Sequence, residues 1–265
     1  MHLALGVEYD GSAFHGFQLQ KAAATVQGAL EQALSRIADH PLRIAAAGRT
    51  DAGVHATGQV VGFASNAERP IQAWVKGVNA LTPPSVKVRW AREVDPRFHP
   101  RYSATARRYM YLWYEDDVTS PTLDRWAVRV RHLDDDAMHA ASRSLVGEHD
   151  FSAFRASGCQ SESAHRCVHR ITVHRHGPLV VLDIAANAFL LHMVRNIAAA
   201  LRDVGEGRRP AGWLAETLAG RDRKHVGPTA PAHGLYLVGV RYPDQAFPPG
   251  EPPPLLRSLG GLARV

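Results

Sequence analysis

The sequence contains little cysteine, little lysine and no long apolar run. Only two of its 265 residues are cysteines, Cys159 and Cys167, which are too few to staple a chain of this length. Reduced thiols are typical of the cytosol. No window approaches the run of about 18 apolar residues that a membrane-spanning helix needs. The first residues reach an acid at Glu8, so they lack the apolar core of a secretory signal. These absences predict a soluble, cytoplasmic protein.

The charged residues are mostly arginines. The chain has 31 basic and 25 acidic residues, a net charge of +6, and the bases divide into 27 Arg and 4 Lys. An excess of positive charge favours a polyanionic partner such as nucleic acid, and the planar guanidinium suits phosphates and base edges. With 45% hydrophobic residues, the chain is long enough for one large domain or two compact ones.

The first part of the chain alternates strand and helix patterns in the order β-α-β-β-α-β. Residues 2–9 alternate with Leu3, Leu5 and Val7 on one face, which predicts a strand. Thr25 is placed to cap a helix whose apolar residues recur at helical spacing. The expected elements are a strand at 2–9, a helix at 26–39, strands at 42–48 and 57–64, a helix at 71–81 and a strand at 85–93.

The second part repeats the same order without visible sequence similarity to the first. We expect a strand at 103–114, a helix at 134–146, strands at 168–176 and 179–187, a helix at 188–204, a short helix at 211–219 and a strand at 234–242. Two successive units of this kind predict an α+β protein made of two ferredoxin-like halves, each with a four-stranded antiparallel sheet.

Proline marks the boundaries of these parts. Pro100 interrupts regular structure near the joint, so we expect an N-terminal half at 1–100 and a C-terminal half at 101–242. The remaining tail, 243–265, holds six of the 17 prolines within residues 243–254. We expect this tail to be extended, disordered and exposed to solvent.

The segment GRTDAGVHA, at 48–56, combines two glycines, a cation and a carboxylate in one short connection. Arg49 and Asp51 lie close enough to share a loop, in which the cation would hold the carboxylate ionised. Spacing alone favours a structural turn in which Asp51 caps backbone amides. His55 follows four residues later, and a structural role suits it better than that of a general base.

As a string, GRTDAGVHA resembles the catalytic loop of the pseudouridine synthases, and in particular of the tRNA pseudouridine synthase A (TruA) family. YDGSAFHGFQLQ (9–20) is similar to the first segment of that family, although Phe17 stands where many members have Trp. Four further segments match in the family's order, and the resemblance covers roughly residues 3–242. They are FHPRYSATARRYMY (98–111), GEHDFSAFR (147–155), ANAFLLHMVRNI (186–197) and APAHGLYLVGV (230–240).

The resemblance implies a fold and an activity. The family's fold has two ferredoxin-like halves whose sheets join into one continuous sheet flanked by helices. Its members are homodimers that isomerise uridine to pseudouridine at nucleotides 38 to 40 of the tRNA anticodon stem-loop, without a cofactor. Asp51 matches the catalytic carboxylate. It would act either as a nucleophile on the anomeric carbon or as a stabiliser of a cationic sugar, as in glycoside hydrolysis.

Three more residues take substrate-binding roles by the same resemblance. Tyr109 matches the tyrosine that stacks on the flipped uracil, although by pattern alone it is one of several alternating aromatic residues on strand 103–114. Arg195 matches an arginine near the catalytic carboxylate, and Arg49 is the candidate to fill the space that the flipped base leaves. Leu190 or Leu191 closes the apolar pocket or packs in the core.

The remaining expectations concern partners. Binding of tRNA needs many phosphate contacts, for which we name Lys21, Arg97, Arg101, Arg107, Arg108, Arg155 and Arg170. The cysteines in CQSESAHRCVHR are spaced too far apart for a typical structural zinc site, so no metal is expected. Two rival interpretations are a non-catalytic RNA-binding protein on the same scaffold and a synthase that acts on another RNA.

Overall fold

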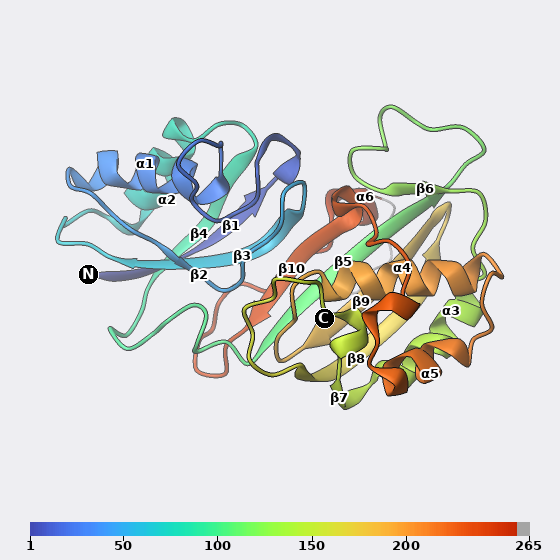
Figure 1. Ribbon diagram of the computed structural model, residues 1–265. Helices are drawn as coiled ribbons and strands as arrows, with labels where there is room; N and C mark the ends of the chain where they lie inside the picture. Colours follow the sequence, from blue (N-terminus) through green and yellow to red (C-terminus); the bar gives the residue numbers. More distant parts are fainter. Residues whose placement is uncertain (259–265) are drawn as a thin grey trace. The chain divides into compact units, whose positions relative to one another are not determined.

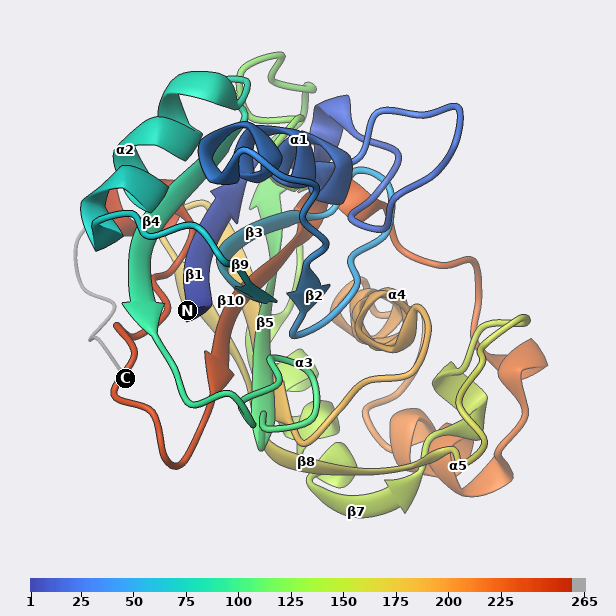
Figure 2. The ribbon, with the colours of Figure 1, turned by 90° about the vertical axis from the view of Figure 1, so that its left-hand side faces the viewer.

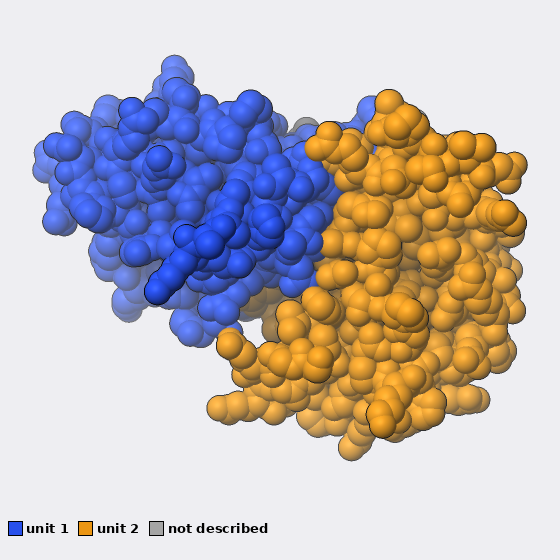
Figure 3. Space-filling view, turned by 45° about the horizontal axis from the view of Figure 1, so that its top comes forward, with its two compact units in different colours: residues 1–105, 236–265 blue, residues 106–235 orange. Residues whose placement is uncertain are grey.

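The computed structural model describes residues 1–258 and divides the chain into two compact units (Figure 3). Unit 1 consists of Met1–Thr105 together with the segment that begins at Tyr236, and unit 2 is Ala106–Leu235. Within residues 1–258, no helix is both long and apolar enough to cross a membrane.

Unit 1 has the strand order expected of a ferredoxin-like fold. The central strand β1 (His2–Tyr9) pairs antiparallel with β3 (His55–Ala64) on one side and with β4 (Val86–Glu93) on the other. The short strand β2 (Ala45–Ala46) pairs antiparallel with β3, which completes the order β4-β1-β3-β2. Strand β10 (Leu235–Arg241) runs parallel to the start of β3, where Tyr236 lies opposite His55.

Two helices, α1 (Val26–Ala38) and α2 (Ile71–Leu81), lie side by side over one face of this sheet (Figure 2). The Thr25 side chain caps α1 by accepting a hydrogen bond from the backbone N–H of Gly28. The two helices approach closely at Gly77, which has no side chain. A Cβ at this position would lie 2.3 Å from Ile37 Cδ1. Their buried faces, which include Leu30, Leu34 and Trp74, form the core with the sheet.

Unit 2 contains a sheet with the order β5-β9-β8-β7, in which all neighbours are antiparallel. These strands are β5 (Ala106–Glu115), β7 (Gly147–Asp150), β8 (His165–His176) and β9 (Leu179–Ala186), and β6 (Val128–Val130) adds to β5 in parallel. Helices α3 (Asp135–Ser142), α4 (Met193–Gly205) and α5 (Trp213–Gly220) accompany it (Figure 1). The predicted α+β class, with antiparallel sheets flanked by helices, is confirmed.

Several elements are shorter than the sequence predicted, among them α3, which covers only part of the helix expected at 134–146. The strand expected at 42–48 forms only β2, because the chain then leaves the sheet for the loop before β3. The helix expected at 188–204 starts at Met193, since His192 adopts a left-handed conformation with φ of 59°. Hydrogen bonds from the backbone N–H groups of Cys167 and Ala188 to Asn187 Oδ1 hold the chain in a turn before that helix.

Residues 245–253 have no regular secondary structure, and many residues of 243–258 are exposed, but the expectation of an exposed tail is wrong for Phe247 and Leu256. Phe247 stacks on Trp90 at a centroid distance of 4.8 Å and meets Tyr242 edge to face. A short helix, α6 (Pro254–Ser258), buries Leu256 completely. Proline-rich composition therefore did not prevent packing, because the Phe247 side chain between the prolines found apolar partners in unit 1. Residues 259–265 of the predicted tail lie outside the described part of the chain.

Candidate active site

The loop that carries Arg49 and Asp51 connects β2 with β3 in unit 1. It turns back on itself where the backbone N–H of Val54 donates to the Asp51 carbonyl at 3.2 Å. Gly53 has a φ of +79°, a conformation that glycine adopts without strain. Along the loop, Arg49 is exposed, Thr50 is buried and Asp51 is half-buried. The loop therefore presents a cation and a carboxylate from a short, turn-closed connection.

The segment from Asp10 to Phe17 packs directly against this loop. A Cβ at Gly11 would lie 2.0 Å from the carbonyl oxygen of Val54, so only glycine fits there. Gly16 has a φ of +92°, and a Cβ there would lie 3.0 Å from the Thr50 carbonyl oxygen and 3.3 Å from the Asp51 carbonyl carbon. The backbone N–H of Phe17 donates to the Thr50 carbonyl at 3.0 Å. Two glycines thus let one backbone support another at the position of the expected catalytic residue.

His55, at the end of the loop, is a structural residue in this arrangement. Its side chain is buried and stacks on Tyr236 with ring centroids 4.8 Å apart. Its Nδ1 lies 3.1 Å from the backbone nitrogen of Gly11 and 3.2 Å from Asp10 Oδ1. Burial opposes ionisation of Asp10, but hydrogen bonds from His55 and Ser12 outweigh it and hold the pKa of Asp10 well below its usual range.

Tyr109 lies on β5 of unit 2, on the same face as Tyr111 and Trp113. Its ring meets that of Phe189 edge to face, with centroids 5.1 Å apart and planes at 85°. Phe189 belongs to the irregular segment that precedes α4, so the late start of that helix is what brings this ring onto Tyr109. The side chain of Tyr109 is nearly buried, with 8% of its residue surface exposed.

Arg195 lies on the first turns of α4 and faces the same side of the sheet. Its Nε donates to the carbonyl oxygen of Ala230 at 2.8 Å. Burial raises the pKa of Tyr111, while the positive charges of Arg195 and Arg202 act in the opposite direction. Arg195 is therefore placed along the face of β5 that carries Tyr109, and its guanidinium is oriented by the loop around Ala230.

A buried hydrogen-bond network holds that loop on α4. Asn196 is fully buried; its amide donates to the Phe154 carbonyl at 2.8 Å, and its Oδ1 accepts from the Thr229 hydroxyl, also at 2.8 Å. Arg223 donates to Asn196 Oδ1 at 3.1 Å and to the backbone carbonyls of Val226 and Gly227. This network fixes the loop that in turn orients Arg195.

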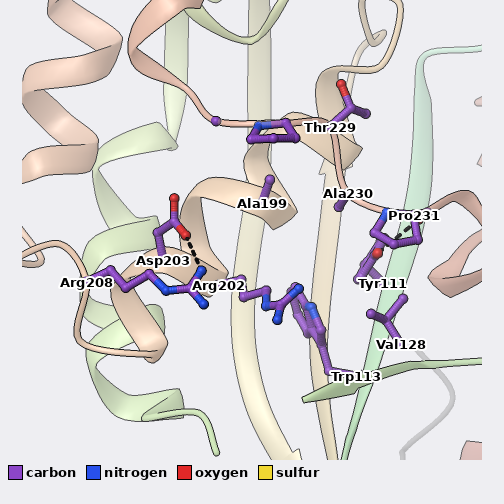
Figure 4. Close-up of a pocket in the computed structure, with 12 residues that line it drawn as sticks. Tyr111, Trp113, Val128, Ala199, Arg202, Asp203, Arg208, Thr229, Ala230 and Pro231 are labelled. Carbon is purple, nitrogen blue, oxygen red and sulfur yellow. Dashed lines mark hydrogen bonds and ion pairs between the residues drawn. The ribbon is translucent and has the colours of Figure 1, made fainter. Parts of the chain in front are cut away.

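A cavity of about 270 Å³ opens beside this loop in unit 2 (Figure 4). Tyr111, Trp113 and Val128 line one wall and the loop at 227–231 lines another. The arginines of the cavity are already paired. Arg202 Nε lies 2.9 Å from Glu206 Oε1, and Arg208 bridges Asp203 and Glu206. Because these charges are locally balanced, the cavity has no uncompensated cation of its own with which to attract an anion.

The four predicted site residues fall into two pairs. Arg49 and Asp51 share one loop of unit 1, as the spacing predicted, whereas Tyr109 and Arg195 lie on β5 and α4 of unit 2. Of the two leucines considered for the pocket, Leu190 is buried and Leu191 is 36% exposed.

The cysteine-rich segment forms no cluster of metal ligands. Cys167 Sγ lies 3.7 Å from His169 Nδ1, and Cys159 Sγ accepts a hydrogen bond from the backbone N–H of Leu191. Across residues 1–258, no group of three or more His, Cys, Asp or Glu side chains is arranged to hold a metal ion.

Several basic residues proposed for phosphate contacts are engaged within the protein. Arg108 and Arg170 both pair with the buried carboxylate of Asp183, at 2.7 and 3.0 Å. Arg97 pairs with Asp95, but its side chain is 92% exposed, so a phosphate could compete for it. Arg101 lies over the exposed ring of Tyr102, 5.5 Å from its centroid. Of these arginines, Arg97 and Arg101 are therefore exposed, whereas Arg108 and Arg170 form ion pairs within the protein.

Comparison with known proteins decides the family. A family model described as tRNA pseudouridine synthase matches residues 6–103 and 141–243. The chain belongs to this tRNA pseudouridine synthase family. It is therefore an isomerase that converts uridine in tRNA to pseudouridine, as the sequence predicted.

Curated relatives agree over nearly the whole chain. A tRNA pseudouridine synthase A of Aeromonas hydrophila is 53% identical, over 95% of this chain and 94% of the relative. One from Shewanella sp. (strain ANA-3) is 52% identical, over 92% and 94%. A solved structure titled "Crystal Structure of a Cbf5-Nop10-Gar1 Complex" has 14% identity and a TM-score of 0.34, covering 76% of this chain and 45% of that one. The family assignment is based on the family model and on the two curated relatives, and not on this solved structure.

Sequence reasoning did not single out the buried polar residues around the candidate site. Gln59 was a polar position in a mostly apolar strand, and Tyr9 ended an alternating strand. Asn196 followed Arg195 inside an amphipathic helix. A polar side chain within an apolar pattern is a usable signal, because burial obliges it to find a hydrogen-bond partner.

Proposed function

We propose that the protein forms pseudouridine at nucleotides 38 to 40 of the tRNA anticodon stem-loop, with Asp51 as the catalytic carboxylate and no cofactor. We further propose that it acts as a homodimer in the cytoplasm, where tRNA is modified. The family supports the reaction, and the turn-closed loop that carries a half-buried Asp51 is the observation that supports the residue.

The reaction is an isomerisation that requires no electron donor or acceptor. The bond from the ribose anomeric carbon to N1 of uracil breaks, the base turns, and the same carbon bonds to C5. The proton on C5 is lost, and N1 gains a proton. An ionised carboxylate assists the first step either as a nucleophile at the anomeric carbon or by stabilising positive charge on the sugar. In both roles Asp51 must be ionised and held in a fixed direction.

The other site residues are assigned to handling of the base. Tyr109 offers an aromatic face on which a flipped pyrimidine regains the stacking it lost in the RNA. Phe189 supports that ring from its edge at 5.1 Å and so restricts its orientation. Arg49, exposed on the loop, fills the space that the flipped uridine leaves.

Arg195 is assigned to the support of the carboxylate. A guanidinium keeps a nearby carboxylate ionised and oriented by charge-assisted hydrogen bonds. In this structure Nε of Arg195 donates a hydrogen bond to the Ala230 carbonyl. This hydrogen bond restricts the orientation of the rest of the guanidinium. Removal of the side chain should therefore lower kcat more than it weakens tRNA binding.

Release of tritium from tRNA labelled at C5 of uridine tests the proposal, because only bond formation at that carbon expels the label. We expect release by the wild type and none by Asp51→Asn, with tRNA affinity retained. Labelled tRNA transcripts in which the uridine at position 38, 39 or 40 is replaced, one position at a time, test which nucleotides are modified.

The outcomes separate the interpretations. Binding of tRNA without release by the wild type would favour the non-catalytic RNA-binding alternative. Release from labelled nucleotides outside 38–40 would indicate a synthase that acts elsewhere. Loss of affinity together with activity in Asp51→Asn would show that Asp51 holds the structure of the loop. Sedimentation of the free protein tests the homodimer.

A further inference from the structure

Thr50 lies between the two chemically active residues of the loop and points the other way. Its residue surface is 8% exposed, whereas Arg49 is exposed and Asp51 half-buried. The Thr50 hydroxyl lies 2.8 Å from the phenol oxygen of Tyr9, inside unit 1. A buried side chain is thus tethered at the position immediately before the proposed catalytic carboxylate.

The hydrogen bond between Tyr9 and Thr50 belongs to a chain that includes Gln59. The Gln59 amide nitrogen donates to the Gly48 carbonyl at 2.8 Å, which fixes which way the amide faces. The same nitrogen approaches the Tyr9 oxygen at 3.4 Å as a weak second donor. Either hydroxyl is able to donate in the bond between Tyr9 and Thr50. Gln59 and Tyr9 therefore connect Thr50 to β3.

The Tyr9 phenol stays protonated at neutral pH. Burial raises the pKa of Tyr9 to about 12, although hydrogen bonds to Thr50 and Gln59 oppose the shift. The Tyr9 hydroxyl therefore keeps its proton and acts as a hydrogen-bonding group rather than as an acid or base. Its side chain is buried away from solvent, with 3% of the residue surface exposed, so it does not reach a substrate.

The anchor points are rigid. Tyr9 is the last residue of β1, and Gln59 lies on β3, the strand with which β1 pairs; Val7 is opposite Gln59 in that register. The Thr50 carbonyl is held independently by the backbone N–H of Phe17. Thr50 is thus fixed at both its side chain and its main chain, and each bond comes from a different segment of unit 1.

We propose that the Tyr9 phenol and the Thr50 hydroxyl are positioning groups that set the direction in which Arg49 and Asp51 leave the loop. This inference rests on the proposed role of Asp51. The hydroxyl locks the rotation of the chain around Thr50, and the neighbouring side chains are carried with it. Since a misplacement of about 1 Å is able to cost about 100-fold in rate, loss of this lock lowers turnover without removing any group that touches RNA.

The test replaces the hydroxyl but keeps the shape. In Thr50→Val a methyl takes the place of the hydroxyl, and in Thr50→Ser the hydroxyl is retained. We expect kcat for tritium release to fall about 10- to 100-fold in Thr50→Val, with KM for tRNA little changed. Thr50→Ser should recover most of that loss. Tyr9→Phe, which leaves Thr50 intact, should lower kcat in the same direction.

A matched control separates positioning from stability. Thr82 is also buried in unit 1, and its hydroxyl donates to the Val86 carbonyl at 2.9 Å. Thr82→Val should lower the melting temperature about as much as Thr50→Val but leave kcat unchanged. Wild-type kcat in both Thr50→Val and Tyr9→Phe would overturn the proposal. Equal loss in Thr50→Val and Thr50→Ser would also overturn it, because the methyl packing would then matter and not the hydroxyl.

The remaining outcomes are equally distinct. If Thr50→Val does not fold, Tyr9→Phe alone decides, and an unchanged kcat in it overturns the proposal. If the wild type itself releases no tritium, the proposed function fails rather than this inference. If Asp51→Asn stays active while Thr50→Val loses activity, the lock acts on a residue other than Asp51, which also overturns the proposal as stated.

Discussion

Gly16 lies directly against Thr50: a Cβ at position 16 would stand 3.0 Å from the Thr50 carbonyl oxygen. Gly16 also has a φ of +92°, which side-chain-bearing residues rarely adopt. We expect Gly16→Ala to lower the free energy of unfolding by about 1–3 kcal/mol and to reduce kcat, since the loop must shift to make room. Urea denaturation and tritium release measure the two effects.

Gly212→Ala is the control for that prediction. Gly212 has φ of −65°, and a Cβ there meets nothing within 4 Å, so the same substitution introduces neither strain nor a clash. The kcat of Gly212→Ala should equal that of the wild type. Its free energy of unfolding should be equal to or slightly higher than that of the wild type. Equal stability of Gly16→Ala and Gly212→Ala would contradict the close approach of the two segments.

Asp183 is the shared carboxylate of two arginines. It is 3% exposed and receives two hydrogen bonds from Arg108, at 2.8 and 2.7 Å, and one from Arg170 at 3.0 Å. Asp183→Asn removes the negative charge and leaves the less exposed Arg108 without compensation. We expect a loss of about 3 kcal/mol in the free energy of unfolding, measured in urea.

The exposed pair of Asp95 and Arg97 provides the comparison. Their side chains are 48% and 92% exposed, so water already solvates both charges. Asp95→Asn should leave stability little changed, because exposed ion pairs contribute little. A comparable loss in both variants would mean that burial of the Asp183 carboxylate is not what makes its pairing important.

Asp10 should contribute to acid sensitivity. Its folded-state pKa is lowered, so ionised Asp10 stabilises the fold above its unfolded pKa of about 3.9, and that stabilisation is lost as pH falls below it. Asp10→Asn keeps the oxygen that accepts from Ser12 but has no charge to lose. The stability difference between wild type and variant should therefore shrink as pH drops below about 4. Curves that stay parallel in that range would contradict the prediction.

Binding of tRNA should weaken steeply with salt, because phosphate contacts release counterions. The exposed cations Arg97 and Arg101 are the contacts that we expect to contribute, whereas Arg108 is occupied by Asp183. We expect affinity to fall at least about tenfold between 50 and 200 mM salt, by filter binding. Arg101→Gln should reduce the slope of this dependence, and an unchanged slope would remove Arg101 from the binding surface.

Much of the fold was readable because periodicity reports directly on which face of an element is buried. Strand β1 and helices α1 and α2 were predicted to within one residue. Apolar residues such as Leu3 and Leu5 alternate along the strand, and those of the helices, such as Trp74, recur at helical spacing. Strand β7 was missed because GEHD has no apolar alternation. Phe247 and Leu256 were misjudged because composition does not show that Phe247 stacks on Trp90 or that Leu256 is buried.

The sequence by itself determined the family, the order of most elements and the loop that carries Arg49 and Asp51. These three features follow from hydrophobic periodicity and from sequence motifs, both of which are local properties of the sequence. Only the tertiary structure decided that Gly16 supports this loop, that Tyr9 and Gln59 tether Thr50, and that Asn196 and Arg223 hold the segment beside Arg195. Those contacts join residues far apart along the chain. They depend on the angle and depth of packing, which a one-dimensional pattern does not specify.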